Sequence, residues 1–190
     1  MSSAIAVLLI SLGAFVRFLP HPHNAVAIGA LAIYAGARLP KSWALVVPIA
    51  ALFISDAAKV YGTAYADTLF APASLLRYAI VGGIALASAY GPRKVSVMGR
   101  GLQGAGAALI FFLASNFLVW AFPYGLPGEP GVYPHTVAGL FECYTMGLPF
   151  FRNSLVAEVM GVGVLFLVDE LAHALAVRKT RFSDNNSLAS

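Results

Sequence analysis

The sequence predicts an all-α membrane protein, a polytopic bundle of about six transmembrane helices with a short amphipathic helix on the outer face. Composition is the first reason. Apolar residues make up 59% of the 190 residues, against roughly 45–50% in a soluble domain. Charged residues make up only 11%, against about 25%. So few charges cannot cover a water-facing surface, and the mean hydropathy of +0.80 indicates lipid as the main solvent.

The second reason is a series of apolar runs, because a spanning helix needs about 20 mostly apolar residues, fewer inside a bundle. The expected helices cover residues 4–19, 25–38, 42–58, 74–90, 101–122 and 152–177. Pro20 ends the first, Pro48 predicts a kink in the third, and Gly91-Pro92 ends the fourth. The two helices within 25–58 are the shortest predictions, and a re-entrant hairpin covered by protein is the alternative.

The basic residues indicate the orientation of the bundle. Eight of the 12 lie between or after helices on the side of both termini. They are Arg38, Lys41, Arg93, Lys94, Arg100, Arg178, Lys179 and Arg181. The positive-inside bias makes this side cytoplasmic. We therefore expect a multi-pass protein of the cell inner membrane with both termini in the cytoplasm, a single transmembrane domain at 1–180 and a flexible tail at 181–190.

Small residues recur every four positions on two of the expected helices. The helix at 74–90 carries Ala79, Gly83 and Ala87, followed by Gly91, and the helix at 25–38 pairs Ala25 with Gly29 and Ala32 with Gly36. Small side chains allow helix backbones to approach closely within a bilayer. Both stripes are therefore expected to face neighbouring helices.

Polar residues gather in the outer third of the expected bundle. Asn116 and Glu158 each lie about 9 Å below the outer boundary. The others are Arg17, Asp56, Arg77 and Arg152, near helix ends. Residues near helix ends often snorkel or cap, which is the alternative for the arginines. Asn116 and Glu158 are too deep to reach water easily, so a polar cluster lining a cavity is the preferred interpretation for these two.

Two outer loops carry further candidates. The first is Pro20-His21-Pro22-His23-Asn24, where the prolines stiffen the chain around two imidazoles. Asn24 is expected to cap the next helix, with His21 or His23 touching a ligand. Metal or haem binding is the less favoured alternative.

The third outer loop, 123–151, ends in an expected amphipathic helix at 135–148. Its apolar residues follow helical spacing, and His135 and Glu142 share another face. An interfacial helix and a ligand lid are equally compatible with this pattern. Cys143 is the single cysteine, so it cannot form an internal disulfide. A buried inert thiol is the default. His135 and Cys143 are eight residues apart and point in different directions, which argues against a catalytic pair.

Several classes of function are disfavoured. The basic residues form no stripe with aromatic residues between them, so no nucleic-acid partner is expected. No Cys/His spacing resembles a zinc site, and we expect no metal and no cofactor. The chain has no GxxxxGK[ST] phosphate loop. We expect the protein not to be an enzyme; the alternatives are a membrane-embedded enzyme using His135, Glu142 and Cys143, and a non-transporting scaffold subunit.

Five segments carry a family resemblance. They are RFLPHPHNAVAIGALAIYAGA (17–37), LFISDAAKVYGT (52–63), SNFLVWAF (115–122), YPHTVAGLFECYTMGLPFFRNSL (133–155) and the LF within VGVLFL (162–167). They resemble an uncharacterised family of small bacterial integral membrane proteins. That family is in turn similar to the substrate-binding S components of energy-coupling-factor vitamin transporters.

This resemblance implies a six-helix protein that binds a vitamin-like micronutrient for uptake. Its partners would be the small-molecule ligand, the lipid bilayer and a coupling membrane subunit with two ATPases. S components often have small residues four apart on the first helix, where that subunit docks. Residues 4–15 contain no such pair, so a protein acting alone stays an alternative.

The expected ligand contacts combine this resemblance with the positions above. Arginines would pair with a carboxylate or phosphate, and Asn116 and Glu158 would supply hydrogen bonds. Aromatic side chains such as Trp120, Tyr124 and Tyr144 would stack on a flat ring. The candidate ligand-binding residues are Arg17, His21, His23, Asn24, Asp56, Arg77, Asn116, Trp120, Tyr124, His135, Glu142, Cys143, Tyr144, Arg152, Asn153 and Glu158.

Overall fold

The computed structural model describes residues 3–20, 25–63, 66–92, 94–122 and 133–187. Within these ranges the chain is all-helical, with six α-helices, one short 3-10 helix and no strand. The elements are α1 (Ser3–Val16), α2 (Ile28–Arg38), α3 (Lys41–Val60), η1 (Ala66–Phe70), α4 (Pro72–Tyr90), α5 (Val97–Ala121) and α6 (Val137–Ser187). The expectation of an all-α protein is confirmed.

Helix α2 lies at the centre of the bundle. Every residue from Ile28 to Gly36 is buried, and α2 contacts α3, α4, α5 and α6. A Cβ placed on Gly36 would lie 2.3 Å from the backbone oxygen of Ala85 on α4. No side chain larger than hydrogen fits there, so the predicted close packing of α2 through small residues is confirmed at Gly36.

The predicted packing stripe on α4 is wrong. Ala79, Gly83 and Ala87 are exposed, and a Cβ placed on Gly83 would meet nothing within 4 Å. The face of α4 that packs inward instead carries Val81 and Ala85, both with no exposed surface. Four-residue spacing of small residues occurs on both faces of this alanine-rich helix, so spacing alone could not select the buried one.

The expected outer amphipathic helix at 135–148 is not a separate element. Helix α6 runs without interruption from Val137 to Ser187, through Pro149, so residues 149–151 form no break. A proline removes one backbone hydrogen bond and crowds the preceding turn. Packing of α6 along α5 nevertheless keeps both segments in one helix. The backbone of residues 181–187 is also helical, whereas a loose tail was expected there; its flexibility stays a prediction.

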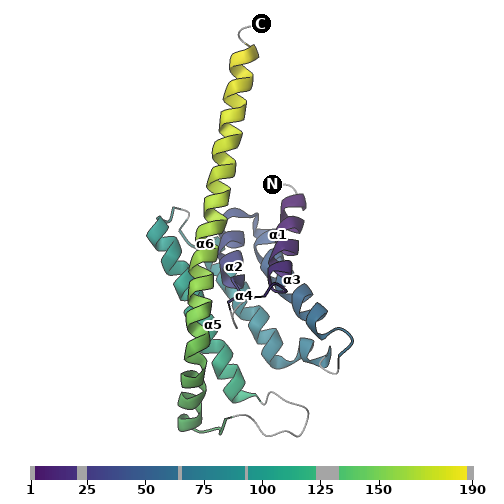
Figure 1. Ribbon diagram of the computed structural model, residues 1–190, viewed down its shortest axis with the longest axis vertical. Helices are drawn as coiled ribbons and strands as arrows, with labels where there is room; N and C mark the ends of the chain where they lie inside the picture. The colour runs from purple at the N-terminus through teal and green to yellow at the C-terminus, as the bar shows by residue number, and fades with distance from the viewer. Residues whose placement is uncertain (1–2, 21–24, 64–65, 93, 123–132, 188–190) are drawn as a thin grey trace.

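Helices α1 and α6 bring the two ends of the chain toward one end of the bundle. Figure 1 shows α1 beginning and α6 ending toward the same end of the bundle, with α6 projecting well beyond its neighbours. Helix α5 begins four residues earlier than expected, because the Ser96 hydroxyl accepts a hydrogen bond from the Gly99 amide (3.1 Å) and caps it. Pro48 lies inside α3, which continues through it to Val60.

In the ranges that the structure describes, two helices are long and apolar enough to cross a membrane, α3 and α5. Shorter apolar helices cover Ala4–Val16, Ile28–Arg38 and Ser74–Tyr90. Large apolar side chains are exposed on the outer surfaces of several helices, among them Leu8, Phe15, Leu109 and Ile110. The lengths and compositions of these helices and their exposed apolar side chains are thus compatible with membrane association.

Candidate functional site

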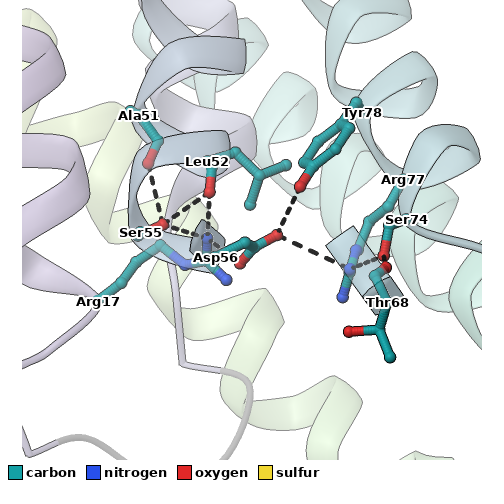
Figure 2. Close-up of polar contacts among 9 residues, drawn as sticks. All are labelled: Arg17, Ala51, Leu52, Ser55, Asp56, Thr68, Ser74, Arg77 and Tyr78. Atoms are coloured by element: carbon teal, nitrogen blue, oxygen red, sulfur yellow. Dashed lines mark hydrogen bonds and ion pairs between the residues drawn. The ribbon is translucent and has the colours of Figure 1, made fainter. Parts of the chain in front are cut away.

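An ion pair joins the end of α1 to α3. Arg17 follows the last residue of α1, and its Nη1 lies 2.8 Å from Oδ1 of Asp56 on α3. Both side chains are only 12% exposed. The same Nη1 donates to the backbone oxygen of Leu52 (3.1 Å) and to the Ser55 hydroxyl, as Figure 2 shows. A buried ion pair needs such extra hydrogen bonds to offset the cost of desolvation.

A second guanidinium approaches the other oxygen of Asp56. Nη2 of Arg77, from the first turns of α4, lies 3.7 Å from Asp56 Oδ2 and donates to the Ser74 hydroxyl (2.9 Å). The Tyr78 hydroxyl donates to the same carboxylate oxygen (3.3 Å). Figure 2 shows Asp56 between the two arginines. One carboxylate is therefore shared by two cations, which leaves the group formed by Arg17, Arg77 and Asp56 with one positive charge in excess.

The two arginines also retain unused donors. Nε of Arg17 and Nε of Arg77 are buried, and neither has a hydrogen-bond partner within the described part of the chain. A buried donor without a partner costs about 1–3 kcal/mol. The positive charge of the two guanidinium groups suits them to attract an anion.

Glu158 of α6 caps the N-terminus of α2. Its Oε1 accepts a hydrogen bond from the Gly29 amide (2.9 Å), and its Oε2 accepts one from the Ala30 amide. The N-cap residue of α2, Ala27, has no side-chain oxygen to do this. A carboxylate also interacts favourably with the positive end of the helix dipole. Glu158 is 4% exposed, so its oxygens bond to the amides of α2 in place of water.

Asn116 and Cys143 connect α5 with α6. The Cys143 thiol donates to the backbone oxygen of Asn116 (3.3 Å), and the Asn116 amide donates to the Phe112 oxygen one turn earlier (2.8 Å). A Cβ placed on Gly147 would lie 2.5 Å from Oδ1 of Asn116. Gly147 therefore allows the Asn116 side chain to lie against α6.

These groups meet at one cavity of about 500 Å³. Five of the sequence-predicted residues line it: Arg17, Arg77, Asn116, Cys143 and Glu158. Most of the remaining wall is apolar, with Phe111, Phe112, Phe150, Phe151, Tyr133 and Met146. Drug-sized ligands bind in pockets of about 300–1,000 Å³ with mostly apolar walls and few polar groups. The cavity has this character.

A comparison with protein families gives one match, the family of unknown function DUF6580, over residues 1–181. The chain belongs to the DUF6580 family. No curated protein and no solved structure matches the sequence. Any function of the cavity in this DUF6580 protein is therefore inferred from its own geometry.

Other candidate residues of this DUF6580 protein do not line the cavity. Asp56 lies behind the arginines and acts through them. The Tyr144 hydroxyl donates to the Leu113 oxygen (2.9 Å), and the Trp120 indole donates to the Pro134 oxygen (2.9 Å). The His135 ring packs on Trp120, with 5.6 Å between the ring centroids. These side chains hold the start of α6 against α5.

Three more candidates lie on α6 away from the cavity, and four cannot be placed. Glu142 and Arg152 are exposed, and Asn153 is half-buried without lining the cavity. His21, His23, Asn24 and Tyr124 lie outside the described residues.

The aromatic wall of the cavity was missed in the sequence, because phenylalanines in an apolar helix also suit a lipid-facing surface. The spacing of two phenylalanines from the polar residues could have revealed this wall. Phe112 lies four residues before Asn116, and Phe151 lies seven before Glu158. These spacings place each ring on the same helix face as the polar residue.

The described part of the chain places no base in hydrogen-bond contact with Cys143. Among the described residues its thiol hydrogen-bonds only to Asn116, through the backbone oxygen and, at 3.9 Å, the side-chain oxygen. No group of three or more His, Cys, Asp or Glu side chains in the described ranges is arranged to hold a metal. The structure thus brings charged and polar side chains to the wall of one largely apolar cavity.

Proposed function

We propose that this DUF6580 protein binds a small organic anion inside the membrane and serves its uptake, in the manner of a substrate-binding S component. The observation that carries this proposal is the cavity of about 500 Å³ where Arg17 and Arg77 share a single carboxylate, Asp56. The carboxyl group of Glu158 in the same wall is already bonded to the amides of Gly29 and Ala30, so the two arginines that share Asp56 favour a carboxylate or phosphate at their side of the cavity.

The proposed membrane arrangement has all six α-helices spanning or embedded in the bilayer. Arg17, Arg77, Asn116 and Cys143 all lie near helix ends that face away from the chain termini. The described basic residues between helices lie at the same end of the bundle as the two chain termini. By the positive-inside bias, that end would be cytoplasmic. The cavity then lies toward the outside, which suits capture of a nutrient.

The proposed ligand has an apolar, flat part beside its anionic group. Rings of Phe111, Phe112, Phe150 and Phe151 line the same cavity as the two arginines. Aromatic rings pack well against another ring in offset or edge-to-face geometry. Trp120 and Tyr144, expected from the sequence to stack on the ligand, are not part of this arrangement. Their polar tips already bond to backbone oxygens.

Uptake would require a source of energy from outside this chain. The resemblance to S components implies a coupling membrane subunit with two ATPases. The first helix, α1, has no pair of small residues four apart between Ala4 and Phe15, so docking through α1 would differ from that of S components. A protein acting alone is the alternative, and co-purification of such subunits decides between them.

Mass spectrometry of small molecules released from the purified full-length protein tests the proposal. We expect one organic anion in near-stoichiometric amount. Ser115 lines the cavity, whereas Thr145 is exposed on α6. Ser115→Phe should therefore lose the molecule, and the matched control Thr145→Phe should keep it. Release of no molecule after incubation with a cell extract, or of a cation, would contradict the proposal; the first result would favour a scaffold role.

A further inference from the structure

A second cavity, of about 840 Å³, lies at the opposite end of the bundle. It is formed where α5 begins, where α2 ends, and along the middle of α6. Figure 1 shows the start of α5 toward the end of the bundle at which both termini lie. Neither this cavity nor its residues take part in the ligand site described above.

The polar wall of this second cavity carries more positive than negative charge. Arg38, Lys94 and Arg100 line it, together with one carboxylate, Glu170. Arg38 is already paired, with Nε 2.8 Å from Asp169 and Nη2 2.6 Å from Glu170. No carboxylate in the described part of the chain pairs with Lys94 or Arg100.

The guanidinium of Arg100 is held in a fixed position. Its Nη1 donates to the Gln103 side-chain oxygen (2.9 Å), and its Cζ lies 4.2 Å from the centre of the Phe166 ring. Stacking on an aromatic ring leaves the edge of a guanidinium available for hydrogen bonds. A fixed cation with free donors binds a phosphate more strongly than a mobile one does.

The rest of the cavity is apolar and opens onto the outer surface of α5 and α6. Val159, Val162, Gly163 and Leu167 line it on α6. A Cβ placed on Gly163 would meet nothing within 4 Å, so the backbone forms an open groove there. Leu167 is 60% exposed. An apolar groove that leads from two free cations to the lipid-facing surface suits a molecule with an anionic head and an alkyl chain.

We propose that this cavity binds an anionic phospholipid, with its phosphate between Lys94 and Arg100 and one acyl chain along Gly163. Basic pockets between transmembrane helices on the cytoplasmic side are suited to anionic headgroups. Charge complementarity selects an anionic over a zwitterionic lipid, and the groove selects a lipid over a free phosphate ion.

The test compares lipids and variants on the full-length protein in detergent, by native mass spectrometry. We expect phosphatidylglycerol to stay bound where phosphatidylcholine does not. Lys94→Gln combined with Arg100→Gln should weaken phosphatidylglycerol binding roughly thirtyfold, at about 1 kcal/mol per cation. Lys41→Gln removes a charge outside this cavity, from a lysine that lies over the Tyr90 ring (4.3 Å), and should leave binding unchanged.

Two further arms keep the result interpretable. Gly163→Leu should displace the acyl chain and weaken phosphatidylglycerol binding, while the melting temperature in phosphatidylcholine stays that of the wild type. Inorganic phosphate serves as the competitor without a chain. Equal retention of both lipids, equal binding by the double variant and Lys41→Gln, or full competition by millimolar phosphate would each overturn the proposal.

Discussion

Glu158 and Gly29 form the contact that fixes the central helix of this protein. The carboxylate of Glu158, from α6, accepts a hydrogen bond from the Gly29 amide at the start of α2 (2.9 Å). A Cβ placed on Gly29 would lie 2.9 Å from that same oxygen. The glycine therefore allows a carboxylate from a distant part of the chain to cap a buried helix, and the cap forms part of the cavity wall.

Replacement of Glu158 by alanine should destabilise the protein. The change would leave the amides of Gly29 and Ala30 without an acceptor in a buried place, at a cost of about 1–3 kcal/mol. Thermal unfolding in detergent measures this. Glu142→Ala removes an exposed carboxylate from the same helix and is the matched control. Equal melting temperatures for the two variants would show that the cap contributes nothing.

Alanine substitutions of one glycine on α2 and one on α4 should have different effects on stability. Gly36→Ala would place a Cβ 2.3 Å from the Ala85 oxygen, so α2 and α4 must separate, at about 1–3 kcal/mol. Gly83→Ala meets no atom within 4 Å and should be neutral or stabilise by up to about 1 kcal/mol through reduced backbone entropy. Unfolding of both variants checks this, and a loss of stability in Gly83→Ala alone would mean that the inward face of α4 is assigned wrongly.

The single cysteine gives a direct report on the occupancy of the cavity. Cys143 is 2% exposed and lines the cavity wall. A small maleimide should label it much more slowly in the folded protein than after denaturation. The ligand found by mass spectrometry should slow labelling further, because it fills the space through which the reagent must approach. Labelling at the same rate with and without ligand would place the ligand elsewhere.

Cys143→Ser should bind the ligand about as well as the wild type does. A hydroxyl can make the same hydrogen bond to the Asn116 oxygen that the thiol makes. Equilibrium binding of the identified ligand checks this. Loss of function without loss of folding in this variant would favour the alternative of a membrane-embedded enzyme.

The sequence predicted the helices well, because long apolar runs and the prolines and glycines that end them act locally. The common depth expected for Asn116 and Glu158 is wrong: Asn116 lies beside Gly147, whereas Glu158 lies beside Gly104, 12 residues before Asn116 on α5, which is about 18 Å along the helix. The structure brings Arg17, Arg77 and Cys143 to the same cavity. That these residues bind a ligand stays a prediction.

Several features depend on tertiary contacts that no local pattern contains. Two separate helices were expected at 135–148 and 152–177, but α6 continues through Pro149 against α5. Glu158 was interpreted as a hydrogen-bonding group for a ligand, whereas its oxygens accept from the amides of Gly29 and Ala30, 129 and 128 residues earlier in the chain. Arg152 was grouped with Arg17 and Arg77, but its position on α6 leaves it exposed.

Arg77 and its neighbours are the residues that we propose to hold the organic anion. Arg77 is half-buried, lines the cavity and shares Asp56 with Arg17. Arg152 is exposed and does not line the cavity, so Arg152→Gln is the matched loss of one charge.

The most direct measurement is equilibrium binding of the identified ligand to these two variants by isothermal titration calorimetry. A charge-assisted hydrogen bond contributes about 1.5–3 kcal/mol, so Arg77→Gln should weaken binding by roughly tenfold to a hundredfold. Arg152→Gln should bind as the wild type does. Equal affinities for Arg77→Gln and the wild type, or a loss confined to Arg152→Gln, would contradict the assignment of this cavity as the ligand site.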